Sequence, residues 1–126
     1  MTPVTVANTA RDGSGTVELI YTVEDAGGTY VDRIVTTTLG TNAATESVVL
    51  ISNGYGLTNP RNNAVLGNRQ LTATTLGTAL STDIETFTVD AWCDEGTEFY
   101  ALVHATQAAG RQFILYGDST GSYQLY

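Results

Sequence analysis

The chain has no lysine, one cysteine and one histidine among its 126 residues, and each shortage excludes a class of protein. A nucleotide-binding P-loop requires a lysine in the motif G-x-x-x-x-G-K-[ST], so no P-loop is present. One cysteine cannot form an internal disulfide, which fits folding in a reducing cytosol. One cysteine and one histidine are also too few for a structural zinc site.

Positive charge is scarce. Thirteen acidic residues oppose five basic ones, for a net charge of -8. The basic residues are scattered singly and form no cluster that would neutralise phosphates, so binding to nucleic acid or to an anionic membrane surface is not expected. The acidic balance favours solubility or a partner with a positive surface. The basic residues are Arg11, Arg33, Arg61, Arg69 and Arg111.

Long apolar runs are missing as well, so no membrane-spanning helix is expected. The opening residues, "MTPVTVANTA", lack a basic region followed by an apolar segment, and a signal peptide is not expected. The composition, 42% hydrophobic and 14% charged, is typical of a folded chain. Its length predicts a single domain over residues 1–126.

The dominant pattern is a period-two alternation of apolar and polar residues, rich in Thr, Val, Tyr and Ile. In the first such segment Val17, Leu19, Tyr21 and Val23 share one face. Gly67 interrupts a later segment and predicts a bulge there. The pattern predicts an all-β chain, an antiparallel β-sandwich or jelly roll of about seven to eight short strands. The expected strands are 16–23, 29–40, 46–54, 64–74, 83–90, 97–106 and 111–118, with an edge strand within 121–126.

The Gly-rich stretch "ARDGSGTVELIYTVED" at residues 10–25 invites a catalytic or ion-binding interpretation. Asp12 is followed by Gly13, which is the wrong order for an aspartic protease loop, and Asp12 alone cannot supply a calcium loop. The stretch therefore predicts a corner between strands. Gly13 or Gly15 would adopt positive φ there, and Asp12 or Ser14 would bond nearby amides.

Cys93 lies in the segment "AWCDEGTE", beside Trp92. A thiol nucleophile needs a basic partner that lowers its pKa. The neighbours Asp94, Glu95 and Glu98 would raise that pKa instead, so we expect Cys93 to be a small packing residue. The same three carboxylates leave a calcium site open as an alternative.

His104 is the single histidine, and no nucleophile-elbow motif G-x-S-x-G accompanies it. We expect His104, near Tyr100 and Leu102, to line a sheet face or an interface. The thirteen acidic residues leave a pair of carboxylates for glycoside hydrolysis open. The sequence assigns no catalytic, cofactor-binding or metal-binding residue, no cofactor is expected, and the interface residues are unknown.

The aromatic residues have two interpretations. Together with Trp92 the seven tyrosines can form a sugar-binding face on a sandwich, or they can pack in the core and at sheet edges. Their spacing shows no cluster in the sequence. The tyrosines are Tyr21, Tyr30, Tyr55, Tyr100, Tyr116, Tyr123 and Tyr126.

Three segments, "ANTARDGSGT", "DRIVTTTLGT" and "GTEFYALVHATQAAGRQFILYGDST", resemble a group of small β-sandwich proteins encoded among phage structural genes. The similar segments are short turn and strand signatures toward both ends of the chain. Two features depart from the group. "CDEG" at 93–96 replaces a more apolar, proline-bearing turn, and the tail "GSYQLY" extends past the usual end.

The resemblance implies a non-enzymatic virion component, a capsid decoration (cement) protein made in the host cytoplasm and placed on the capsid surface. Its implied partners are the major capsid protein and itself, as a dimer or trimer. Residues 1–9 are a candidate N-terminal arm. The alternatives are a tail- or fibre-associated receptor- or carbohydrate-binding module and a small hydrolase. An exposed aromatic face holding Trp92 would favour the module, and His104 beside Ser and Asp would favour the hydrolase.

Overall fold

The computed structural model describes residues 3–10, 13–54, 63–77 and 84–119. These residues contain seven strands and no helix, which confirms the predicted all-β antiparallel class. It follows that no helix in the described residues is long and apolar enough to cross a membrane. The edge strand expected within 121–126 lies outside them. The strands are β1 (Glu18–Thr22), β2 (Thr29–Thr37), β3 (Thr45–Ser52), β4 (Asn63–Leu71), β5 (Glu85–Cys93), β6 (Glu98–Val103) and β7 (Gln112–Ser119).

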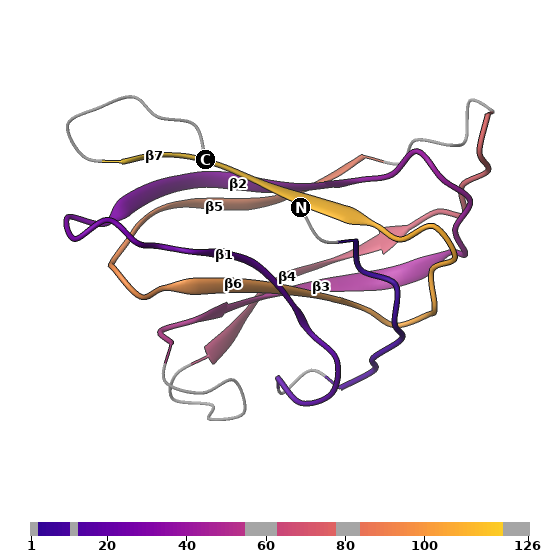
Figure 1. Ribbon diagram of the computed structural model, residues 1–126, viewed down its shortest axis with the longest axis horizontal. Coiled ribbons are helices and arrows are strands. Elements are labelled where there is room, and N and C mark those ends of the chain that lie inside the picture. Colours follow the sequence, from indigo (N-terminus) through magenta and orange to yellow (C-terminus); the bar gives the residue numbers. More distant parts are fainter. Residues whose placement is uncertain (1–2, 11–12, 55–62, 78–83, 120–126) are drawn as a thin grey trace.

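The strands form two stacked sheets, which make a small β-sandwich (Figure 1). One sheet has the order β1-β6-β3-β4 and the other the order β5-β2-β7. All neighbouring strands are antiparallel. The β3–β4 connection stays within one sheet, while each other connection passes to the opposite sheet. Loops from both sheets therefore meet at each end of the sandwich.

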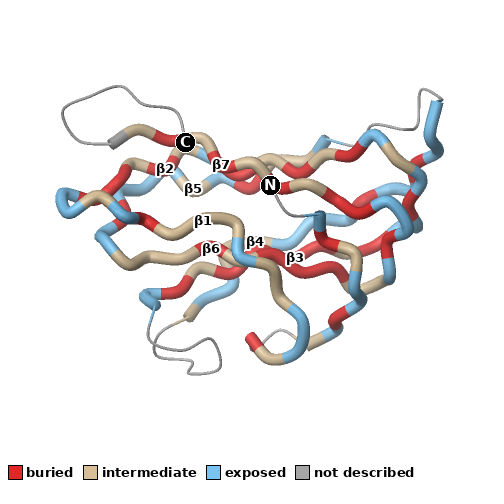
Figure 2. Tube along the Cα trace, in the orientation of Figure 1, coloured by how far each residue is buried: buried red, intermediate tan, exposed pale blue. Residues whose placement is uncertain are grey.

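The core lies between the sheets, and burial alternates along β2 and β7 (Figure 2). The Phe87 and Phe113 rings lie 6.3 Å apart, both within the three-stranded sheet. A second apolar cluster of Val48, Leu50 and Leu102 is buried on the outer face of the four-stranded sheet. The main cluster includes Val31, Ile34, Val49, Phe87, Phe99, Ala101, Val103, Phe113 and Leu115.

Two predicted strand details need correction. The register between β1 and β6 jumps from Leu19 to Tyr21, so a bulge at Ile20 shifts the alternation. Because of that shift, Ile20 and Tyr21 pack against the core while Leu19 is 47% exposed, so Leu19 and Tyr21 do not share a face. In addition, β6 ends at Val103, and His104 lies in a bend rather than in a strand.

The bulge predicted at Gly67 is confirmed. Val49 pairs with Gly67 and Leu50 pairs with Val65, which leaves Leu66 as the extra residue of β4. The turn at "CDEG" is also present, with Gly96 at a φ of 91°.

The corner predicted before β1 is confirmed for its glycines, since Gly13 and Gly15 have φ values of 88° and 75°. Its organising side chain is Asn8, which the sequence did not indicate. The Asn8 amide donates to the carbonyls of Ser14 (2.8 Å) and Thr16 (2.9 Å) and accepts from the Ala10 N–H (2.9 Å). A Cβ at Gly15 would lie 2.8 Å from the Asn8 amide, so this corner also requires glycine for space. Asp12 lies outside the described residues.

The candidate N-terminal arm, residues 1–9, is described from residue 3 onward, and this part lies against the chain's own sandwich. Val4 forms an antiparallel bridge with Arg111, and Ala7 a parallel bridge with Val103. The Asn8 N–H donates to the Val103 carbonyl at 2.8 Å. A role toward a neighbouring subunit stays a prediction.

Candidate functional site

Cys93 is buried at the end of β5, with 5% of its surface exposed. Burial is the larger cause that raises the pKa of its thiol, and the charge of Asp94 adds to it. The thiol lies 3.8 Å from the Ala91 carbonyl oxygen. Because the thiolate is the reactive form, this environment suits packing and not nucleophilic attack.

Alkylation of Cys93 tests that placement. At mildly alkaline pH iodoacetamide is expected to label the folded chain far more slowly than the chain unfolded in urea, since the buried thiol is both shielded and protonated. The labelled fraction is measured by mass spectrometry over time. Equal rates in the two states would show that the thiol is accessible and reactive.

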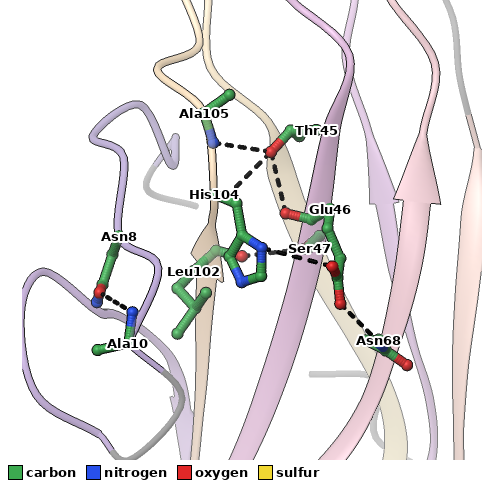
Figure 3. A network of polar contacts seen from close by, with 9 residues as sticks. All are labelled: Asn8, Ala10, Thr45, Glu46, Ser47, Asn68, Leu102, His104 and Ala105. Atoms are coloured by element: carbon green, nitrogen blue, oxygen red, sulfur yellow. Dashed lines mark hydrogen bonds and ion pairs between the residues drawn. The ribbon is translucent and has the colours of Figure 1, made fainter.

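His104 lies at the edge of a polar network on the four-stranded sheet (Figure 3). Its Nδ1 is 3.5 Å from the Glu46 carboxylate, which also accepts from the Asn68 amide at 2.7 Å. The nearby Ser47 hydroxyl is fully buried and donates to the Leu102 carbonyl at 3.2 Å. This cluster therefore offers a histidine and an acid but no exposed serine nucleophile.

The carboxylates considered for calcium, Asp94, Glu95 and Glu98, are not grouped around a position that could hold an ion. The Tyr100 hydroxyl donates to the Glu98 carboxylate at 3.0 Å. In the turn, the backbone carbonyl of Asp94 accepts a hydrogen bond from the Thr97 N–H. Among the described residues no group of three or more His, Cys, Asp or Glu side chains is arranged to hold a metal ion.

Three aromatic residues that are far apart in the sequence share the outer face of the three-stranded sheet. Tyr30 pairs with Trp92 on β5, and Arg33, three residues after Tyr30, pairs with Tyr116 on β7. We call Tyr30, Trp92 and Tyr116 the aromatic face. Its members were identified individually from the sequence, but their proximity depends on strand register and was missed. Tyr55, Tyr123 and Tyr126 lie outside the described residues.

The Tyr30 hydroxyl donates a hydrogen bond to the Asp90 carboxylate. This bond is the main cause that raises the pKa of Tyr30 to about 12, with further contributions from burial and from the charges of Asp90, Asp32 and Asp118. The negative charges oppose formation of a tyrosinate.

An Asp90→Asn variant is expected to lower the pKa of Tyr30 from about 12 toward the ordinary value of 10.0. In the unfolded chain Tyr30 ionises near its ordinary pKa of 10.0, whereas in the folded chain its pKa is about 12. The Tyr30–Asp90 hydrogen bond therefore contributes fully to stability below pH 10.0, and this contribution is lost as the pH rises to about 12. Tyrosinate absorbance during an alkaline titration measures the shift. Tyr30→Phe identifies the step that belongs to Tyr30, and an unchanged titration of Asp90→Asn would contradict the assignment.

Three large apolar side chains are exposed in the connections that follow β2 and β4. Both strands end at the right of Figure 1. Leu39, Leu76 and Ile84 are 74%, 68% and 64% exposed. They lie in the β2–β3 and β4–β5 connections, and we call them the apolar end. The Leu76 N–H donates to the Thr41 hydroxyl at 3.0 Å, which ties the two connections together.

The apolar end stands on a buried polar network. The Asn42 amide donates to the Thr38 hydroxyl (3.0 Å) and the Gly110 carbonyl (3.1 Å) and accepts from the Ala109 and Gly110 N–H groups (3.1 and 2.9 Å). The Asn42 backbone also exchanges two hydrogen bonds with Thr74. These bonds join described parts of the β2–β3, β4–β5 and β6–β7 connections, so the segments that carry Leu39 and Leu76 are hydrogen-bonded to one another.

Arg111, one of the five arginines, is fully buried at this same end. Its guanidinium donates to the Gln107 side chain (2.8 Å) and to the carbonyls of Ala43 (3.1 Å) and Thr72 (2.8 Å). An arginine has five donors in a planar fork, which suits one side chain that bridges several loops. No pattern in the sequence distinguishes Arg111 from the exposed Arg33 and Arg69.

Comparison with family models, with curated proteins and with solved structures found no match to this chain.

Proposed function

We propose that this chain is a capsid decoration protein that binds the outer surface of a major capsid shell and stabilises it. The observation that carries the proposal is the apolar end, because large apolar side chains exposed on neighbouring segments are a feature of protein-binding surfaces. The resemblance of the chain to small phage β-sandwich proteins supports the same role.

The geometry suits repetitive display on a shell. Loops that are already fixed by Asn42 and Arg111 lose little conformational freedom on binding, which reduces the entropic cost of association. Three apolar side chains provide a modest contact, and self-association as a dimer or trimer on a symmetric shell multiplies it through avidity. The net charge of -8 favours a receiving surface with positive groups around the apolar contact.

Co-sedimentation with virus particles that lack the protein tests the proposal. The purified chain is expected to bind saturably, with a fixed ratio to the major capsid subunit. A triple variant, Leu39→Ser with Leu76→Ser and Ile84→Ser, is expected to bind at least about tenfold more weakly, since the apolar area buried by three side chains is lost.

Leu19→Ser is the control, because Leu19 is an exposed leucine on β1, an edge strand of the four-stranded sheet, and not in the connections that carry the apolar end. It is expected to bind like the wild type. Equal binding of the triple variant and the wild type would show that the apolar end is not the surface that contacts the capsid. Failure of the wild-type chain to bind any particle would contradict decoration itself.

The second candidate is a receptor- or carbohydrate-binding module of a tail or fibre. The aromatic face favours it, because exposed aromatic rings on a sheet are suited to stacking on a ligand. Fractionation separates the candidates, since a decoration protein is recovered with heads and a module with tails.

A further inference from the structure

Specific contacts hold two side chains of the aromatic face, Trp92 and Tyr116, in place at the surface. Trp92 is 48% exposed, yet its indole packs closely against the backbone at Gly28. The approach is so close that a Cβ at Gly28 would lie 2.5 Å from the indole nitrogen. On the other side of β2, the Arg33 guanidinium lies 4.4 Å from the centre of the Tyr116 ring. The exposed Trp92 ring and the half-buried Tyr116 ring are therefore both held in set orientations.

Asp90 provides a second, independent feature of the same face. Among the described residues it is the one non-glycine residue with positive φ, at 46°. The β2–β5 register shifts next to it, between Val31 and Arg33, so Asp90 lies in a bulge. The bulge brings its carboxylate to the Tyr30 hydroxyl. Backbone strain of this kind is concentrated at binding sites, where a side chain must be held in a set position.

An open concavity of about 310 Å³ lies beside Tyr30 and Tyr116, and Trp92 is the cross-strand neighbour of Tyr30 on β5. Its walls combine aromatic rings with charged groups, and Gly117 lies in the lining without a side chain. The lining residues are Tyr30, Asp32, Arg33, Tyr116, Gly117 and Asp118. A concave site with rings and a few convergent polar groups is the usual form of a small-ligand site.

The charges of the face select the class of ligand. Three carboxylates, Asp32, Asp90 and Asp118, stand against one guanidinium, and this balance disfavours anions. A cation is also disfavoured, because Arg33 already covers Tyr116 and the concavity is too open to enclose and desolvate a cation. An uncharged ligand rich in hydroxyl groups remains, with carboxylates as acceptors and Arg33 as donor.

The geometry points to a binding site for neutral oligosaccharides on the outer face of the three-stranded sheet. The apolar face of a sugar ring would stack on the exposed indole of Trp92, and hydroxyls of the neighbouring sugars would bond to Asp118, Asp32 and Arg33. The site does not depend on capsid binding, because the apolar end belongs to different loops. A failure of one proposal therefore leaves the other intact.

The chain's single tryptophan provides a direct assay, since Trp92 fluorescence reports on this face alone. The purified chain is titrated with maltohexaose, cellohexaose, mannohexaose, xylohexaose and N-acetylated chitohexaose. At least one of them is expected to change Trp92 emission saturably. Tyr116→Ala is expected to weaken that association about tenfold or more, because it removes one wall of the concavity and the ring on which Arg33 lies. Asp118→Asn is expected to weaken it less, since an amide keeps one acceptor oxygen.

Leu19→Ala serves as the matched control on the other sheet and is expected to bind like the wild type. Calorimetric titration checks the affinities without fluorescence, and circular dichroism checks that Tyr116→Ala is folded. The proposal is overturned by an absence of saturable change with all five sugars or by equal affinity in Tyr116→Ala. Binding of choline or of a sulfated polysaccharide at this face, with none of the five sugars bound, would also overturn it.

Discussion

Replacing Arg111 with alanine is expected to lower the free energy of unfolding by about 3–5 kcal/mol, because three acceptors of one buried guanidinium lose their donor together. The guanidinium is fully buried and bonds to Gln107 and to the carbonyls of Ala43 and Thr72. Each buried acceptor left without a donor costs about 1–3 kcal/mol. Urea unfolding followed by Trp92 fluorescence measures the change.

Arg33→Ala is the matched control, because Arg33 has a side chain that is 44% exposed and an exposed ion pair with Asp32. Its loss is expected to be below about 1 kcal/mol. Arg111→Lys is expected to fall between the two, since an ammonium keeps the charge but cannot reach three acceptors in one plane. Equal losses for Arg33→Ala and Arg111→Ala would mean that the buried network does not hold this end together.

Gly117→Ala is expected to destabilise the fold by about 2–3 kcal/mol, the range for overpacked positions. A Cβ at Gly117 would lie 2.4 Å from the Tyr30 carbonyl oxygen and 3.3 Å from the Val31 Cα. These are backbone atoms of the central strand β2, so a change of side-chain rotamer cannot relieve the overlap. Thermal or urea unfolding measures the loss.

The control for this prediction is Gly67→Ala, which adds the same methyl group to another strand. A Cβ there would lie 3.4 Å from the Phe87 ring, an ordinary contact. The change is expected to stay within about 1 kcal/mol, since alanine also reduces the freedom of the unfolded chain. A Gly117→Ala variant as stable as Gly67→Ala would show that β2 and β7 are not packed as closely as described.

Local features of the fold were predictable from the sequence. Alternation in segments such as 29–40 and 111–118 identifies strands, because each strand needs one face in the core. The glycines of the corner and the bulge beside Gly67 were predictable because backbone geometry at these positions depends on the residue itself. Errors arose where a bulge changes the alternation, as at Ile20.

Features that depend on pairing between distant strands were not predictable. Tyr30, Trp92 and Tyr116 meet because β2 pairs with both β5 and β7, and one residue of register shift would separate them. Arg111 is buried because distant loops surround it, whereas Arg33 lies exposed on β2, and the sequence around each does not reveal this difference. Asn8 likewise organises a corner that extends eight residues away. The pattern of a single sequence indicates which face of a strand is buried and where turns occur. A site built from several strands also depends on how those strands are paired.

The number of copies of this protein per major capsid subunit in purified virus particles tests the central claim most directly. The decoration proposal predicts a copy number in fixed proportion to the capsid subunit, recovered with heads, and weaker particles after the protein is removed. Absence from particles, or a few copies confined to the tail fraction, would contradict it.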